Sequence, residues 1–158
     1  MSVHEEWLKK LKVWKENLKQ KTGKDFLFPP PSNETLQVEY TVIEPGKKME
    51  AKFPYQKRFS NPVGLYQGGF LSAAIDEVLG PLSYISAGVP CMTLSLNVTY
   101  LKAFPESMGH VIVEGTILQK TKSLVFMRAE VRSPTGDIIA HAESHATIMR
   151  EDQLVKSL

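Results

Sequence analysis

The chain has 158 residues, of which 42% are hydrophobic and 23% charged, and its formal net charge is +2. This length suits one domain with a single core, and the composition is neither disordered nor fibrous. The charge is too mild for a nucleic-acid-binding protein, which normally carries a concentrated basic stripe. Cys91 is the only cysteine, and the N-terminus lacks the apolar core of a signal peptide. We therefore expect a soluble protein of the cytoplasm, with no nucleic-acid or membrane partner.

The first residues predict an amphipathic helix over residues 3–21. Ser2 and Glu5 have the spacing of a capping box, apolar residues then recur at helical intervals, and Gly23 is a stop signal. The lysine-rich face of this helix leaves open a membrane-surface or nucleic-acid contact. Acidic residues interrupt that face, however, and favour a solvated helix that lies on its own domain or on a dimer mate.

The rest of the chain predicts a connector and then an α+β domain. Three prolines indicate a stiff extended connector over residues 26–32. Alternating apolar residues predict strands over residues 36–42, 48–55, 92–100, 109–119, 123–133 and 137–149. Gly68-Gly69 opens a helix that runs at least to Leu79, where Gly80-Pro81 bends or breaks it. We expect a long antiparallel sheet wrapped around this central helix, with residues 1–34, 35–150 and 151–158 as N-terminal segment, domain and tail.

Charge is nearly absent from the middle of the chain. Asp76 and Glu77 are the only charged residues among the 43 residues from Phe59 to Leu101. Glycines and prolines interrupt this stretch, so a transmembrane helix explains it poorly. A segment that packs on its own core on one side and on a second subunit or a ligand on the other explains it better.

A helical projection separates these two carboxylates. Asp76 lies in a stripe of small residues, and Glu77 lies on the flank between this stripe and the apolar face; the stripe is Gly69, Ser72, Ala73, Gly80 and Ser83. Small residues permit the close approach of a backbone, a subunit or a substrate. A carboxylate there is costly to bury unless it is paired, which makes Asp76 the better functional candidate.

Gln67-Gly68-Gly69 stands where a loop meets this helix. Free N–H groups and the helix dipole at such a point favour a negative charge or a developing oxyanion. A Gly-Gly pair alone is equally typical of a tight turn.

These motifs together resemble the hotdog-fold acyl-CoA thioesterases of the PaaI-type and 4-hydroxybenzoyl-CoA-thioesterase group. The resemblance rests on Asn61-x-x-Gly64-x-x-Gln67-Gly68-Gly69 with Asp76 eight residues after Gly68, and on the segments 98–102 and 135–142. It covers about residues 35–149 and implies the hotdog fold and the hydrolysis of an acyl-CoA thioester. The family commonly has His at the position of Gln67, so the substrate range is expected to differ more than the reaction.

The resemblance also implies a role for each matching residue. Gly68 would donate its N–H to the thioester carbonyl, Asp76 would act as base or nucleophile, and Asn61 would position water. Gln67 and Gly69 would lie in the substrate-binding segment. Lys102 and Arg128, with Lys120 and Lys122, are candidates to bind the nucleotide end of coenzyme A, although strand-edge charges of this kind are commonly just solvated.

Helix geometry predicts that the site is shared between subunits. The eight residues between Gly68 and Asp76 span about 12 Å of helix. One thioester carbonyl cannot touch both groups of the same chain, whereas an antiparallel partner helix would bring Asp76 of one subunit to Gly68 of the other. We expect a homodimer, or a dimer of dimers.

No metal or cofactor is expected. His141 and His145 share one face of a strand about 13 Å apart, too far to hold one ion. Nucleotide-binding and serine-hydrolase motifs are absent. Two alternatives to hydrolysis remain: a non-catalytic acyl-CoA sensor, and a hydratase or dehydratase. The absence of histidine between His4 and His110 disfavours the second alternative.

Overall fold

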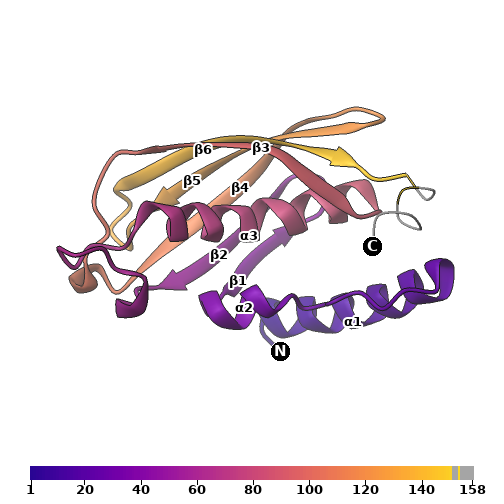
Figure 1. Ribbon diagram of the computed structural model, residues 1–158, viewed down its shortest axis with the longest axis horizontal. Coiled ribbons are helices and arrows are strands. Elements are labelled where there is room, and N and C mark those ends of the chain that lie inside the picture. The colour runs from indigo at the N-terminus through magenta and orange to yellow at the C-terminus, as the bar shows by residue number, and fades with distance from the viewer. Residues whose placement is uncertain (151–152, 154–158) are drawn as a thin grey trace.

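The computed structural model describes residues 1–150 and 153, so the predicted tail at 151–158 lies outside the described residues apart from Gln153. A six-stranded antiparallel sheet, in the order β1-β2-β4-β5-β6-β3, wraps around one face of a long helix, α3 (Figure 1). The strands are β1 (Glu39–Glu44), β2 (Lys48–Pro54), β3 (Cys91–Tyr100), β4 (His110–Lys120), β5 (Leu124–Arg132) and β6 (Ile138–Ile148), and α3 is Gly68–Ala87. The predicted α+β architecture is confirmed.

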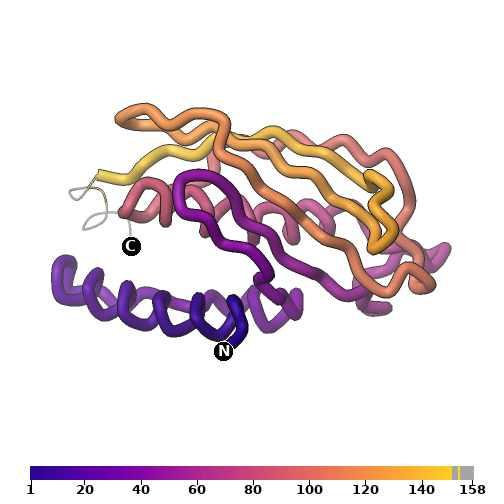
Figure 2. Tube along the Cα trace, turned by 180° about the vertical axis from the view of Figure 1, so that it is seen from behind, coloured from indigo at the N-terminus to yellow at the C-terminus, as the bar shows by residue number. Residues whose placement is uncertain are grey.

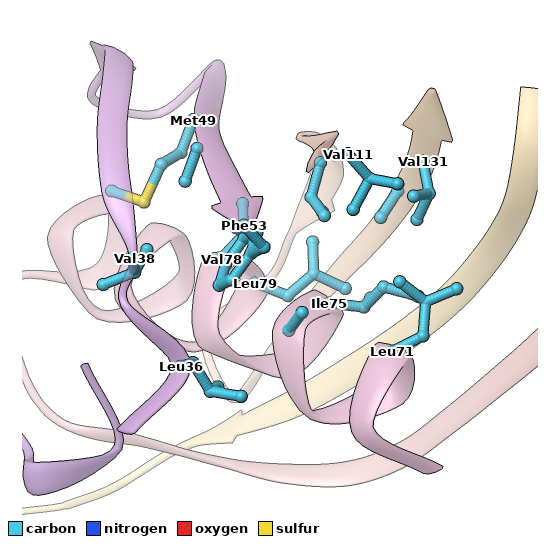
Figure 3. Packing of buried hydrophobic residues seen from close by; sticks show 14 of the residues in the cluster. Leu36, Val38, Met49, Phe53, Leu71, Ile75, Val78, Leu79, Val111 and Val131 are labelled. Atoms are coloured by element: carbon cyan, nitrogen blue, oxygen red, sulfur yellow. The ribbon is translucent and has the colours of Figure 1, made fainter. Parts of the chain in front are cut away.

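The core lies between α3 and the concave face of the sheet. Alternate residues of the strands are buried against the helix, as in β5, where Val125, Met127, Ala129 and Val131 are buried. From α3 come Leu71, Ala74, Ile75, Val78, Leu79 and Leu82 (Figure 3). The helical projection predicts an apolar face of seven residues, of which five are buried and two, Phe70 and Ile85, are partly buried; the buried Leu79 was not part of that predicted face.

The N-terminal helix α1 (Val3–Thr22) lies along the β1 side of the molecule (Figure 2). Its predicted capping box between Ser2 and Glu5 is present, and Gly23 ends it with φ of 72°. Trp7 packs edge-on against Tyr40 of β1, and Trp14 stacks on Tyr84 of α3 at 4.8 Å. The helix therefore packs on its own domain. Within residues 1–150 and 153, no helix has both the length and the apolar character needed to cross a membrane.

A short helix, α2 (Pro31–Leu36), occupies the end of the predicted connector and the start of the first predicted strand. Part of the expected extended connector is helical, and the first strand begins at Glu39 rather than Leu36. Pro31 occupies the first helical turn, where a missing N–H costs nothing and the fixed φ is already suitable. Gln37 then ends the helix in a left-handed conformation with φ of 53°. Helix α2 also spans the boundary expected between residues 34 and 35.

Of the bend or break predicted at Gly80-Pro81 in the central helix, the break does not occur. The helix continues to Ala87 because a tertiary contact replaces the hydrogen bond that proline cannot make. The carbonyl of Glu77 would normally accept from the N–H of residue 81, and here it accepts instead from the hydroxyl of Tyr40 at 3.2 Å. Tyr40 is only 2% exposed, so the replacement donor is built into the core.

Candidate functional site

The loop before α3 is held in shape by Asn61. Its side-chain oxygen accepts hydrogen bonds from the N–H groups of Val63 and Leu65 at 3.1 and 3.0 Å, and its own N–H donates to the Leu65 carbonyl at 2.7 Å. Gly64 supplies the turn with φ of 79°. The Nδ2 group of Asn61 has no hydrogen-bond acceptor among the described residues, so it is available to a water molecule or a ligand.

Gln67 begins α3 through its backbone. Its carbonyl accepts from the N–H groups of Phe70 and Leu71 at 3.0 and 3.2 Å, and its N–H donates to the Phe59 carbonyl at 2.9 Å. Its exposed side chain makes no capping hydrogen bond. The N–H groups of Gly68 and Gly69 have no acceptor among the described residues, so two free donors mark the start of the helix.

Tyr100 lies against this first turn. Its hydroxyl donates to the Gly68 carbonyl at 2.8 Å and lies 2.6 Å from the Ser72 hydroxyl. A Cβ atom on Gly68 would come within 2.9 Å of the Tyr100 ring, whereas one on Gly69 would meet nothing within 4 Å. Glycine at position 68 therefore allows this close packing, and a Cβ atom there would displace the Tyr100 ring.

Asp76 is exposed on α3, and a threonine of the neighbouring strand orients it. The Thr93 hydroxyl donates to Asp76 Oδ1 at 2.9 Å. The other carboxylate oxygen has no donor among the described residues. The structure therefore leaves one oxygen of Asp76 free for chemistry and fixes the other.

Glu77 lies on the opposite flank, where α2 covers it. Asn33 donates a short hydrogen bond to its carboxylate, and Ser32 also bonds it. Burial raises the pKa of Glu77 above its usual value, and the nearby charge of Asp76 adds to this rise. Glu77 serves the packing of α2 on α3 and does not face the same surface as Asp76.

Strand β3 runs past the small-residue stripe of α3. Cys91 contacts Ser83, Thr93 contacts Asp76, and Tyr100 contacts the helix start, so the strand passes along the helix in the opposite direction. The predicted stripe is correct for Gly69, Ala73 and Asp76, which are exposed. Ser83, in contrast, is 1% exposed and lies against Cys91 at the start of β3, so at this end of the stripe the closely packed neighbour is the chain itself.

The outer edge of β3 is open. Beyond it the sheet has no further strand among the described residues, and Met92, Leu94, Tyr100 and Leu101 are exposed near this edge. An open edge and exposed large apolar side chains are typical of a surface that another chain covers.

The four candidate cations do not join this group within the single chain. Lys102 pairs with Asp137 at 2.7 Å, on the segment that follows β3. Arg128 alternates with the buried residues of β5 and is exposed, so it lies on the sheet face away from α3. Lys120 donates to the Ser86 carbonyl at the end of α3, at 2.8 Å, and Lys122 is exposed in a turn.

A cavity of about 780 Å³ lies elsewhere, between α1, β1 and the C-terminal end of α3. None of the predicted site residues lines it. Among the described residues, no group of three or more His, Cys, Asp or Glu side chains could hold a metal ion. His145 instead bonds the hydroxyl of Ser95 at 2.7 Å and stacks on Phe126.

Sequence reasoning brought Asn61, Gly68 and Asp76 to the correct elements but missed three of their neighbours. These neighbours are Thr93, Tyr100 and Ser72. The two from β3 contact residues that lie far away in the sequence: Thr93 is 17 residues from Asp76, and Tyr100 is 32 residues from Gly68. Two signals were present: Ser72 lies in the small-residue stripe, and Tyr100 lies in the segment 98–102 that carries part of the resemblance. The pairing of a strand with a helix face leaves no local pattern.

The sequence model of the thioesterase superfamily matches residues 64–140, a range that contains Gly68, Asp76, Thr93 and Tyr100. No curated protein sequence matches the chain.

Several solved structures share the fold. A putative thioesterase of Ralstonia eutropha JMP134, described as phenylacetic acid degradation-related, is 23% identical with a TM-score of 0.69 and covers 82% of this chain and 97% of its own. The Escherichia coli PaaI protein of the phenylacetic acid degradation operon is 11% identical with a TM-score of 0.71, over 76% of this chain and 85% of its own. The Streptococcus mutans UA159 protein smu.793, solved with acetyl-CoA bound, is 19% identical with a TM-score of 0.66, over 71% of this chain and 88% of its own.

Proposed function

Because this chain is a hotdog-fold member of the thioesterase superfamily, we propose that it hydrolyses an acyl-CoA thioester to a free acid and coenzyme A. One observation carries the proposal: the same exposed side of α3 presents two unpaired N–H groups at its start and, eight residues after Gly68, a carboxylate oriented by Thr93. A thioester hydrolase needs these two features, a donor for the oxyanion and a group that activates water.

In this mechanism the Gly68 N–H binds the carbonyl oxygen of the thioester. The carboxylate of Asp76 takes a proton from a water molecule, and the resulting hydroxide attacks the carbonyl carbon. The tetrahedral oxyanion collapses, the C–S bond breaks, and the thiolate of coenzyme A takes up the proton. In the alternative route Asp76 attacks directly, and water then hydrolyses the mixed anhydride. Asn61 Nδ2 positions the water in either route.

The proposed site is shared across a homodimer. About 12 Å of helix separates Gly68 from Asp76, so each thioester would use Gly68 of one subunit and Asp76 of the other. The open edge of β3 and its exposed apolar side chains support a second copy of the chain as the partner. A fully active monomer in light scattering would overturn this assembly.

The nucleotide end of coenzyme A would bind at the rim of the site. Lys102 remains the better cation for this role because it follows β3 directly, although the ligand would have to compete with Asp137. Arg128 could contribute only to a ligand that reaches the outer face of the sheet. Gln67 and Gly69 would contact the part of the substrate nearest the helix start. No cofactor is needed for this chemistry.

The test compares two neighbouring carboxylates. The wild-type protein is incubated with a panel of acyl-CoAs and a thiol reagent, and the best substrate is then used for Asp76→Asn and Glu77→Gln. Asp76→Asn nearly conserves volume but removes the base, so we expect turnover to fall by about 10²–10⁴. Glu77→Gln is the matched control, because its side chain packs under α2, and it should retain turnover.

Each alternative has its own outcome in this experiment. An inactive Glu77→Gln with an active Asp76→Asn would show that the wrong carboxylate has been chosen. Normal turnover in both variants would exclude the mechanism. A wild-type protein that binds acyl-CoA tightly and releases no thiol would be a sensor, and hydration of an enoyl-CoA without thiol release would indicate a hydratase.

A further inference from the structure

Tyr100, the last residue of β3, joins this strand to the first turn of α3. The Tyr100 hydroxyl donates to the carbonyl of Gly68 at 2.8 Å and lies 2.6 Å from the hydroxyl of Ser72, one turn further along the helix. Gly68 belongs to the first turn, whose N–H groups are unpaired, and Ser72 follows it one turn later. The side chain therefore acts on the part of the helix where the proposed mechanism needs a rigid donor.

The direction of these hydrogen bonds follows because the Tyr100 hydroxyl has one proton to donate and the Gly68 carbonyl has none. A carbonyl oxygen cannot donate, so the single hydroxyl proton of Tyr100 points to Gly68. The short contact with Ser72 must then use the serine proton, with the phenol oxygen as acceptor. The result is a directed chain in which Ser72 donates to Tyr100 and Tyr100 donates to the Gly68 carbonyl.

This chain strengthens the donor that the helix offers. The carbonyl of Gly68 and the N–H of Gly69 belong to the same peptide group, and a hydrogen bond accepted by the carbonyl polarises the N–H of that group. The peptide group that joins Gln67 to Gly68 is polarised in the same way, because the Gln67 carbonyl accepts from Phe70 and Leu71. Both unpaired N–H groups at the helix start therefore belong to peptides whose carbonyls are bonded.

The ring of Tyr100 adds a steric constraint. It lies so close to Gly68 that a Cβ atom there would come within 2.9 Å of Cζ, while 47% of the side chain remains exposed in the single chain. The ring therefore presses on the first turn from one side and presents its other surface at the open edge of β3.

We propose that Tyr100 is a positioning residue of the thioester site, which orients the first turn of α3 and thereby the N–H groups of Gly68 and Gly69 toward the thioester oxygen. Ser72 supports Tyr100, because the hydrogen bond from the serine fixes the orientation of the phenol O–H group. This inference rests on the proposed hydrolysis of acyl-CoA, because it assigns a role in that same reaction.

The kinetic test uses Tyr100→Phe, which keeps the ring and removes the hydroxyl. We expect kcat for the best acyl-CoA to fall about tenfold with KM unchanged, less than the 10²–10³ lost when an oxyanion donor itself is removed. The pH profile of kcat should keep its shape and fall as a whole, since Tyr100 transfers no proton. An unchanged melting temperature and oligomeric state would separate this effect from a loss of folding.

Ser72→Ala tests the directed chain. It should lower kcat two- to fivefold in the wild-type background and have no further effect in Tyr100→Phe, because Ser72 acts only through the phenol. Ser86→Ala is the matched control: its hydroxyl also bonds a carbonyl of α3, that of Leu82 at 2.6 Å, but at the far end of the helix. It should retain wild-type kcat in both backgrounds.

A second pair of variants tests the steric constraint by stability alone. Gly68→Ala should lower the melting temperature in the wild-type background and not in Tyr100→Ala, where the ring is absent. Gly69→Ala should leave the melting temperature unchanged in both, because nothing lies within 4 Å of its added carbon.

The outcomes distinguish this inference from the proposed function. If the wild type hydrolyses no acyl-CoA, the proposed function fails and the role of Tyr100 fails with it. If the wild type is active and Tyr100→Phe retains its kcat within twofold, only the role of Tyr100 is overturned. Equal effects of Ser72→Ala in the two backgrounds would also overturn it, as would a melting temperature of Gly68→Ala that does not depend on Tyr100.

Discussion

The substitution Tyr40→Phe should expose the dependence of α3 on a donor from β1. Proline at position 81 leaves the Glu77 carbonyl without its intrahelical partner, and the Tyr40 hydroxyl takes that place at 3.2 Å. Phenylalanine keeps the ring packed against Trp7 and creates no cavity. The variant therefore isolates the loss of one buried hydrogen bond.

The magnitude follows from this geometry. A buried polar group left without a partner costs about 1–3 kcal/mol. The Tyr40 bond is longer than an ideal O–H···O bond, and the contact from Asn33 to the same hydroxyl, at 3.5 Å, is too long to add much. We therefore expect a loss in the lower half of that range, about 1–2 kcal/mol, and a fall in Tm of about 2–4 °C for each kcal/mol.

The assay is urea denaturation followed by circular dichroism, at one protein concentration so that any self-association contributes equally to every measurement. Tyr40→Phe is measured in the wild-type background and in Pro81→Ala, which restores an N–H at position 81. In the second background its cost should fall below about 0.5 kcal/mol. Tyr55→Phe, which removes a bond to the Gly64 carbonyl in an exposed loop, is the control and should be nearly neutral. An equal cost of Tyr40→Phe in both backgrounds would refute the reasoning.

Two further stability predictions follow from the environment of α3. The pKa of Glu77 is raised in the folded protein, so its contribution to stability is present below the pKa of the unfolded chain and is lost as the pH rises through the folded pKa. Glu77→Gln should therefore gain stability relative to the wild type as the pH rises through this range, and a difference that is constant with pH would contradict this. Gly115→Ala on β4 should cost about 1–3 kcal/mol, because its Cβ would come within 2.7 Å of Leu79 in the core. Gly80→Ala, with nothing within 4 Å, should instead stabilise the helix by up to about 1 kcal/mol. Urea denaturation measures the free energy of unfolding of both glycine variants. Similar changes in the two would show that the core adapts around β4.

Elements with a repeating local pattern could be predicted from the sequence. Helix α1 was predicted from its capping box, its apolar spacing and Gly23, and its bounds differ by one residue at the C-terminal end. Strands β4, β5 and β6 follow the alternation of buried and exposed residues. The apolar face of α3 and the exposure of Asp76 followed from the helical period. These features depend on neighbours within one or two turns or along one strand, so the sequence contains the information directly.

The errors occur where a distant residue supplies a partner. Three prolines predicted an extended segment, but α2 forms where Asn33 bonds Glu77, 44 residues later. Gly80-Pro81 predicted a bend or a break, and the break does not occur because Tyr40 satisfies the carbonyl that the proline leaves free. The small-residue stripe predicted a close neighbour at Ser83 without identifying it, and the tertiary structure shows that this neighbour is the start of β3.

The candidate site divides in the same way. Three of its features could be predicted from the sequence alone: the helix that carries Gly68 and Asp76, the separation of these residues along it, and the loop that contains Asn61. Only the tertiary structure brought Thr93 to Asp76 and Tyr100 to Gly68, and only the fold left β3 at an open edge of the sheet. The physical reason is that a repeating pattern follows from the regular geometry of one helix or strand, whereas the hydrogen-bond partner of a polar group is whichever side chain the packed fold places beside it.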